Sequence, residues 1–214
     1  MTGTINASRI RVMLIDAGTI PLAKCAHLVA SHPFRGQIED IPSGSVRVIQ
    51  MKDVDPVEGV NWAGMSQTEL TGRKGADWLE EGDVIFVPRG TRFYAACLSA
   101  PPGPTVCGPH LYHLRVKTES WLLPRFLAWQ INQPPIQRKL RAAAEGTSQL
   151  SIRRAELEAL PICVPSINEQ QSIVDLVDLA TRERRLFEEL IRNRDLQLEA
   201  IAASLATAEH NPEQ

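Results

Sequence analysis

Residues 166–208 contain neither proline nor glycine, and this stretch constrains the fold more than any other feature of the chain. Ser166 and Glu169 have the spacing of a capping box, in which each side chain accepts a hydrogen bond from the other residue's backbone N–H. The sequence therefore predicts one helix that begins near Ser166 and continues to about Ala208. With the rise of an α-helix it would be about 60 Å long, which is too long for burial within a domain of this size.

The predicted helix carries an apolar seam with a heptad repeat. Its positions are separated alternately by four and three residues, the spacing with which paired helices meet along one line. The length of the helix favours assembly with a partner over the alternative, packing along its own domain. The seam consists of Ile173, Val177, Ala180, Arg184, Phe187, Ile191, Arg194, Leu198, Ile201 and Leu205.

The residues before this helix are expected to form one mixed globular domain, 1–165. Runs of β-branched or apolar residues between turn residues predict several strands. Prolines at favourable first positions predict a helix from Pro124 and another from Pro134 to about Ala144. The proline-rich residues 99–109 are expected to form an exposed loop. The strands are predicted at residues 11–15, 46–50, 84–87 and 111–116.

The predicted fold class is therefore α+β, with short strands and helices in the domain and a long coiled-coil-like helix over residues 166–208. Residues 1–20 are expected to form a leader or an extra strand. Residues 209–214 are expected to form a disordered tail.

Composition excludes several classes of protein. Hydrophobic residues make up 43% of the chain, which is enough for a core and excludes disorder of the whole chain. Residues 1–167 hold 18 basic and 15 acidic residues, whereas residues 168–214 hold 5 and 10, so the domain is mildly basic and the helix acidic. No signal peptide or membrane-length apolar run is present, and the cysteines are far apart. These features predict a cytoplasmic protein with free thiols and no membrane association.

The motifs of common catalytic sites are missing from the sequence. Neither a GxxxxGK[ST] phosphate loop nor GxGxxG, GxSxG or HExxH occurs. Residues 132–135, Asn-Gln-Pro-Pro, are similar to the Asn/Asp-Pro-Pro-aromatic motif of amino-methyltransferases, but they contain an extra glutamine and lack the aromatic residue. Cys107, His110 and His113 are spaced by three, which suits neither a strand nor a zinc finger. We therefore expect a binding module without catalytic residues, metal or cofactor; a metal-dependent enzyme using Cys107 and His110 is the weaker alternative.

Several short motifs follow one another along residues 22–207 in a characteristic order. They include residues 47–54 (RVIQMKDV), 79–86 (LEEGDVIF), 124–140, the turn at 146–148 and residues 157–170 (LEALPICVPSINEQ). In this order they resemble a target-recognition domain and the following helix of the specificity (S) subunit of type I restriction-modification systems. Full-length members of that family carry two such domains and two such helices, whereas this chain carries one of each, so it resembles a half-length S subunit.

This resemblance implies a sequence-specific DNA-binding subunit without catalytic activity. Its domain would recognise one half of a bipartite site in double-stranded DNA. Its helix would act as a spacer and would dock methyltransferase (M) subunits, which use S-adenosylmethionine; a restriction (R) subunit is a further expected partner. A half-length subunit would pair with itself as a homodimer through the seam and so restore two domains.

The expected DNA contacts are basic, amide-bearing and hydroxyl-bearing residues in turns of the domain. Arginine can bridge guanine, glutamine can pair with adenine, and lysine, serine and threonine can hold phosphates. The alternative is that the chain is an assembly scaffold that does not bind DNA. The expected contacts are Arg35, Lys52, Arg73, Lys74, Arg89, Arg92, Arg138, Lys139, Thr147, Ser148, Gln149, Arg153 and Arg154.

Overall fold

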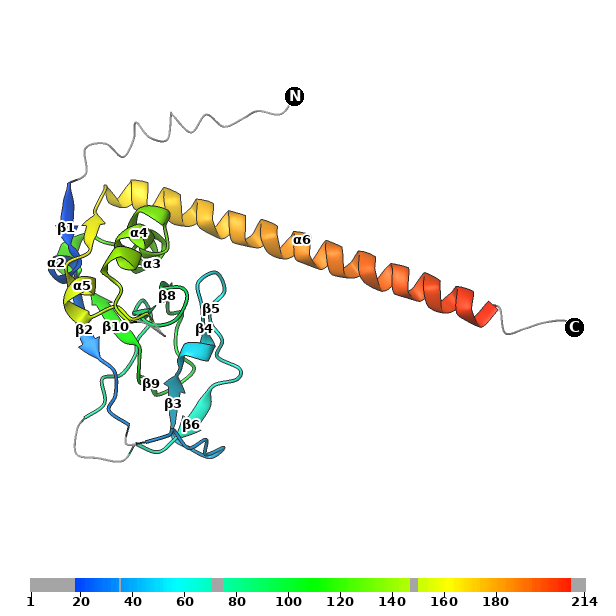
Figure 1. The fold of residues 1–214 in the computed structure, drawn as a ribbon, viewed down its shortest axis with the longest axis horizontal. Helices are drawn as coiled ribbons and strands as arrows, with labels where there is room; N and C mark the ends of the chain where they lie inside the picture. The colour runs from blue at the N-terminus through cyan, green and yellow to red at the C-terminus, as the bar shows by residue number, and fades with distance from the viewer. Residues whose placement is uncertain (1–17, 35, 71–74, 147–149, 209–214) are drawn as a thin grey trace, which may run out of the picture. The chain divides into compact units, whose positions relative to one another are not determined.

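The computed structural model describes residues 18–34, 36–70, 75–146 and 150–208. The chain divides into two compact units, Met1–Ser172 and Ile173–Gln214. A single unbroken helix, α6 (Ile167–Ala208), begins in the first unit and forms the described part of the second (Figure 1). The fold is α+β with a long C-terminal helix, as the sequence predicts.

The larger sheet of the first unit is antiparallel, with the strand order β2-β10-β7-β8. Every residue of its strand β7 is buried, which explains why this strand is a continuous apolar run rather than an alternating pattern. The strands of this sheet are β2 (Ala26–Ala30), β7 (Val84–Val87), β8 (Tyr94–Cys97) and β10 (Tyr112–Val116).

A second, three-stranded sheet has the order β6-β3-β9. Its residue Ile49 packs in one core with Ile85 and Val87 of β7 and Ala96 of β8, so the two sheets share their apolar side chains. The other described strands form two separate two-stranded ladders. The remaining strands are β1 (Thr19–Pro21), β3 (Val46–Ile49), β4 (Val54–Asp55), β5 (Gly59–Val60), β6 (Ser66–Thr68), β9 (Thr105–Cys107) and β11 (Pro161–Cys163).

Strand β9 contradicts the prediction of an exposed loop over residues 99–109. Thr105, Val106 and Cys107 are buried, and they pair in parallel with Arg47–Ile49 of β3. The backbone approaches closely here, because a Cβ atom on Gly108 would lie only 2.4 Å from the carbonyl oxygen of Ile49. The neighbouring prolines indicated a loop, whereas pairing with a distant strand determined the structure.

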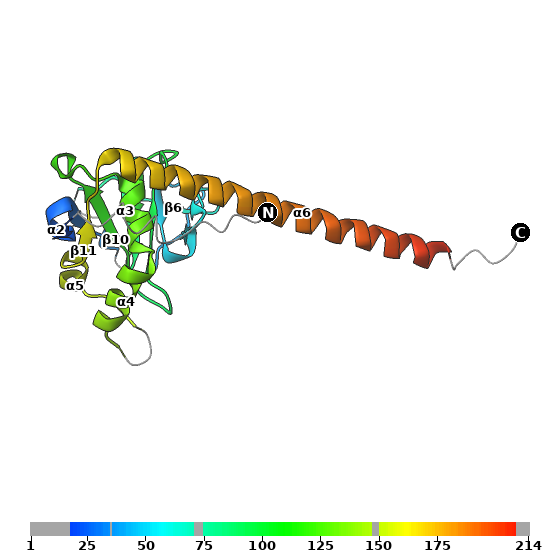
Figure 2. The ribbon, with the colours of Figure 1, turned by 90° about the horizontal axis from the view of Figure 1, so that it is seen from above.

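The helices begin where proline or a cap allows it. Pro124 and Pro134 occupy first-turn positions of α3 and α4, where a missing backbone N–H costs nothing. Helix α3 packs against β7 and β8, and α4 follows it after a short turn (Figure 2). The helices of the first unit are α2 (Leu22–Cys25), α3 (Pro124–Ile131), α4 (Pro134–Ala143) and α5 (Arg154–Glu158), with short 3-10 turns η1 (Met51–Asp53) and η2 (Thr118–Ser120).

The predicted start of the long helix is confirmed. The Ser166 N–H donates to Glu169 Oε2 at 2.9 Å, and the Glu169 N–H donates to Ser166 Oγ at 3.4 Å. Gln170, which ends the last motif of the sequence, is fully buried beside this cap. Its side-chain Oε1 accepts from the Leu123 N–H at 2.8 Å, and its Nε2 donates to the carbonyl oxygens of Trp121 and Pro165, each at 2.8 Å. Gln170 thus joins the first turn of α6 to the domain.

The other predicted elements agree with the structure where it describes them. Strands are present at residues 46–49, 84–87 and 112–116. The strand predicted at residues 11–15 lies outside the described residues, and residues 19–21 form β1. Within the described ranges, no helix combines the length and apolar character needed to cross a membrane.

Candidate nucleic-acid interface

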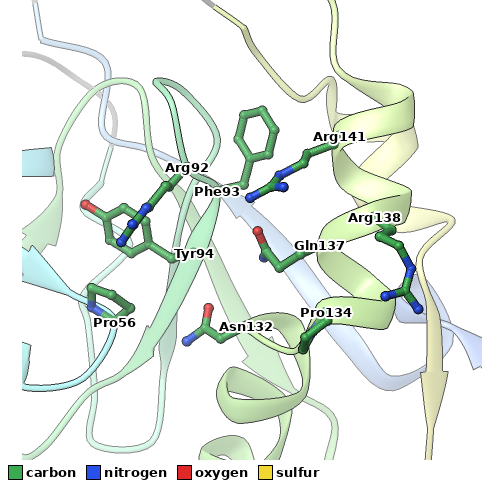
Figure 3. A pocket seen from close by; sticks show the side chains of 9 residues that line it. All are labelled: Pro56, Arg92, Phe93, Tyr94, Asn132, Pro134, Gln137, Arg138 and Arg141. Atoms are coloured by element: carbon green, nitrogen blue, oxygen red, sulfur yellow. The ribbon is translucent and has the colours of Figure 1, made fainter.

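An open cleft of about 490 Å³ lies between the start of β8 and helix α4 (Figure 3). Three of its lining residues are arginines, and none is acidic. We call it the arginine cleft. It is lined by Pro56, Arg92, Phe93, Tyr94, Asn132, Pro134, Gln137, Arg138 and Arg141.

The helical repeat of α4 places two of the arginines at the cleft. Ile136 and Leu140 are buried and hold one face of α4 against the domain. Arg138 and Arg141, spaced by three residues, therefore lie on a more exposed side of the helix. In Figure 3, Arg141 extends toward Gln137 and Phe93, whereas Arg138 lies on the outer side of α4.

The third arginine, Arg92, comes from the strand side of the cleft. It is exposed and precedes β8, and in Figure 3 it stands beside Tyr94. The Tyr94 hydroxyl donates to the carbonyl oxygen of Val54 at 3.2 Å. Burial, together with the nearby charge of Asp55, raises the pKa of Tyr94, so its hydroxyl is neutral near pH 7.

Asn132 joins the two sides of the arginine cleft. Its Oδ1 accepts from the Ala95 N–H at 2.8 Å, and its Nδ2 donates to the Ala95 carbonyl oxygen at 2.8 Å. One side chain thus bonds both backbone groups of a β8 residue, as a neighbouring strand would. Because Asn132 follows α3 and precedes α4, it fixes the α3–α4 turn against β8. Asn132 begins the Asn-Gln-Pro-Pro sequence that is similar to a methyltransferase motif, and in this structure it holds a turn against a strand.

We predict that Asn132→Ala lowers the free energy of unfolding by about 2 kcal/mol, because the two backbone groups of the buried Ala95 lose their partner. Denaturant unfolding of the purified protein measures the change. Asn193→Ala, which removes an exposed amide from α6, serves as the control and should leave the unfolding midpoint unchanged. Equal midpoints for Asn132→Ala and the wild type would show that this contact contributes no stability.

A second, polar pocket of about 440 Å³ contains another of the predicted contacts, Lys52. Gln37, Asp40, Gln50 and Ser66 also line it. Much of its polarity is already used within the protein. Gln50 Nε2 donates to Ser66 Oγ at 3.0 Å, and Asp40 Oδ1 accepts from the Gln67 N–H at 3.0 Å.

The predicted contacts that the structure describes are distributed over several parts of the domain. Arg92 and Arg138 both line the arginine cleft, Lys52 lines the polar pocket, and Lys139 is exposed on α4. Arg89 is half-buried, and its backbone forms an isolated antiparallel β-bridge with Ser151. Six further predicted contacts lie outside the described residues: Arg35, Arg73, Lys74, Thr147, Ser148 and Gln149.

Two other predicted contacts have partners within the domain. Arg153 forms an ion pair with Glu145. Arg154 bonds Glu158 Oε1 at 2.7 Å and the carbonyl oxygen of Leu28 at 2.9 Å. These two arginines therefore stabilise the local structure of the domain. Arg141 was not among the predicted contacts. Because it follows Arg138 by three positions on a predicted helix, the two residues are neighbours on the helix surface.

Cys107 and His110, which the metal-dependent alternative names, lie in different surroundings. The Cys107 side chain is buried, and burial raises the pKa of its thiol to about 12. His110 is exposed, whereas His113 is buried with its Nε2 2.8 Å from Asp83 Oδ2. In the described part of the chain, no group of three or more His, Cys, Asp or Glu side chains is placed to hold a metal ion.

Comparison with known proteins places this architecture among solved structures. No family model and no curated protein matches the chain. An S subunit of a type I restriction-modification system from M. genitalium has 17% identity and a TM-score of 0.53, over 93% of this chain and 46% of that one. The HsdS subunit from Thermoanaerobacter tengcongensis has 14% identity and a TM-score of 0.52, over 77% of this chain and 37% of that one.

A third structure comes from work on complex assembly and conformational transition of the type I restriction-modification system. It has 19% identity and a TM-score of 0.62, over 94% of this chain and 51% of the matched one. The chain thus spans about half or less of the length of these structures. Over nearly its whole length, it has the fold of the S subunits of type I restriction-modification systems.

Proposed function

We propose that this chain acts as a specificity subunit, which binds double-stranded DNA and directs methyltransferase subunits to it. The observation that carries the proposal is the fold likeness over 93–94% of the chain, which includes both the domain and the long helix. In this role the chain has no catalytic residues of its own. S-adenosylmethionine binds to the partner methyltransferase, and a restriction subunit joins the same assembly.

The distribution of charge supports a division of roles between the two parts. The mildly basic domain contains the arginine cleft, whose open side suits a polyanion. The acidic helix suits contact with protein. A scaffold without DNA binding would have no need for three arginines in one cleft.

The exposed seam of α6 supports assembly as a homodimer. Phe187, Ile191, Leu198, Ile201 and Leu205 are each 57–65% exposed in the single chain, so an apolar line along the helix lacks a cover. Such a line is larger than soluble monomers usually leave in water. A second copy of the same helix covers it symmetrically. Two-fold symmetry then gives both domains the same half-site on opposite strands.

The DNA target is therefore expected to be a palindrome interrupted by a spacer of fixed length. Selection of bound duplexes from a random pool, with the methyltransferase subunits present, measures it. The expected result is enrichment of two inverted half-sites at constant separation. Two different half-sites would instead indicate pairing with a different S chain, and no enrichment at all would refute the specificity role.

A further inference from the structure

We propose that the arginine cleft binds the phosphodiester backbone of DNA and does not recognise bases. This inference rests on the proposed function and assigns a ligand class to one site within it. Its three arginines come from two segments, because Arg92 precedes β8 whereas Arg138 and Arg141 belong to α4. A ligand that enters the cleft meets positive charge from both sides.

The arginines of the cleft have no anionic partner among the residues that the structure describes. In the described ranges, none of the three guanidinium groups forms an ion pair or a side-chain hydrogen bond. The nearby carboxylate of Asp55 is engaged elsewhere, since its Oδ1 accepts from the N–H groups of Val57 and Glu58 at 2.7 and 2.8 Å. Like charges that are gathered without a counterion favour an anionic ligand.

Each neutral polar side chain of the cleft makes at least one hydrogen bond within the protein. The Tyr94 hydroxyl donates to Val54, and Asn132 uses both its oxygen and its nitrogen on Ala95. Gln137 Nε2 donates to the carbonyl oxygen of Ile131 at 2.8 Å. An asparagine or glutamine that reads adenine must present a free donor and a free acceptor together. Neither amide of this cleft therefore has both its oxygen and its nitrogen free of contacts within the protein.

Among the described residues, the side chains of the cleft without any such hydrogen bond include the three guanidinium groups, which are donors only. The matching ligand offers acceptors and negative charge, as a phosphodiester does, and the arginine fork fits it with two parallel hydrogen bonds. Guanine also offers two acceptors, but it is neutral and leaves the other two arginines uncompensated. The cleft therefore holds the strand in position while other residues of the domain determine sequence.

The double variant Arg92→Ala, Arg141→Ala tests this assignment, with Arg138→Ala as a single variant at the outer side of α4. Affinity is measured on several duplexes of unrelated sequence over a range of salt concentrations. The expected loss for the double variant is roughly 100-fold, similar on every duplex. The log–log salt slope should fall by about 1.8, since each lost phosphate contact removes about 0.9.

Lys24→Ala is the control, because it removes one exposed positive charge outside the cleft. Each variant is compared with the wild type by thermal unfolding, so that a folding defect is recognised. A loss confined to duplexes with guanine at one position would overturn the assignment in favour of base recognition. A loss no greater than that of Lys24→Ala would also overturn it.

The same data separate this assignment from the proposed function. If the wild type prefers no sequence, yet binds all duplexes through Arg92 and Arg141, the phosphate site stands and the specificity role fails. If the wild type selects a sequence and the double variant retains the full salt slope, the specificity role stands and the phosphate site fails.

Discussion

The double substitution Phe187→Asp, Ile191→Asp is expected to convert the proposed homodimer into a monomer. Phe187 and Ile191 are 57% and 63% exposed in the single chain and occupy adjacent seam positions. Pairing of two variant helices would move four carboxylates into the apolar seam, where the desolvation of each costs several kcal/mol. We expect the dissociation constant to rise on the order of 1000-fold or more. Sedimentation at micromolar concentration should show the wild type at twice 23.7 kDa and the variant at 23.7 kDa.

The matched control places two aspartates on another face of the same helix. Asn193→Asp with Ala200→Asp adds the same charge to exposed positions outside the seam, and this variant should remain dimeric. Both variants should retain a folded domain, since the altered residues belong to the second unit. A monomeric wild type would refute self-association and would leave the seam for a methyltransferase subunit or a different S chain, with an asymmetric DNA target.

Asp83→Asn is expected to lower the free energy of unfolding by about 3 kcal/mol at pH 7, because it removes a buried carboxylate that pairs with the half-exposed Arg115. The Asp83 side chain is 3% exposed. Its oxygens accept from Arg115 Nε at 2.8 Å, from Arg115 Nη2 at 2.7 Å and from the Glu80 N–H at 2.8 Å. His113 Nε2 lies 2.8 Å from the same carboxylate. These contacts join β7 to β10 at the centre of the larger sheet.

The effect of Asp83 depends on pH in a defined direction. Burial alone would raise its pKa, but the contacts with Arg115, His113 and the Glu80 N–H outweigh burial and lower the pKa from 3.8 to about 2. A carboxylate with a depressed pKa in the folded state contributes its full stability above the unfolded value and loses it as pH falls through the folded value. The difference between the wild type and Asp83→Asn should therefore be constant above about pH 4 and should shrink between about pH 4 and pH 2.

Denaturant unfolding at several pH values measures this dependence. Glu80→Gln is the control, because Glu80 pairs with Arg115 at 3.3 Å from an exposed position and should contribute little at any pH. A difference between the wild type and Asp83→Asn that is unchanged at pH 2 would show that the charge of Asp83 is not the source of the stability.

Local patterns in the sequence were enough to predict several elements. The capping box, the absence of proline and glycine, and the heptad repeat predicted α6 and its exposed apolar line. The proline-led helices α3 and α4 and the buried strand β7 were also predicted. Each of these depends on residues within a few positions of one another, because backbone hydrogen bonds in a helix and side-chain periodicity are local.

Only the tertiary structure decided which of the predicted DNA contacts remain free and where they meet. Arg153 and Arg154 are engaged by Glu145 and Glu158, whereas Arg92 joins Arg138 and the missed Arg141 around one cleft. Strand β9 and the bonds of Asn132 to Ala95 likewise depend on partners far away in the chain. Such contacts form only when distant segments pack together, so no local pattern specifies them; periodicity determined the helix, and packing determined the arginine cleft.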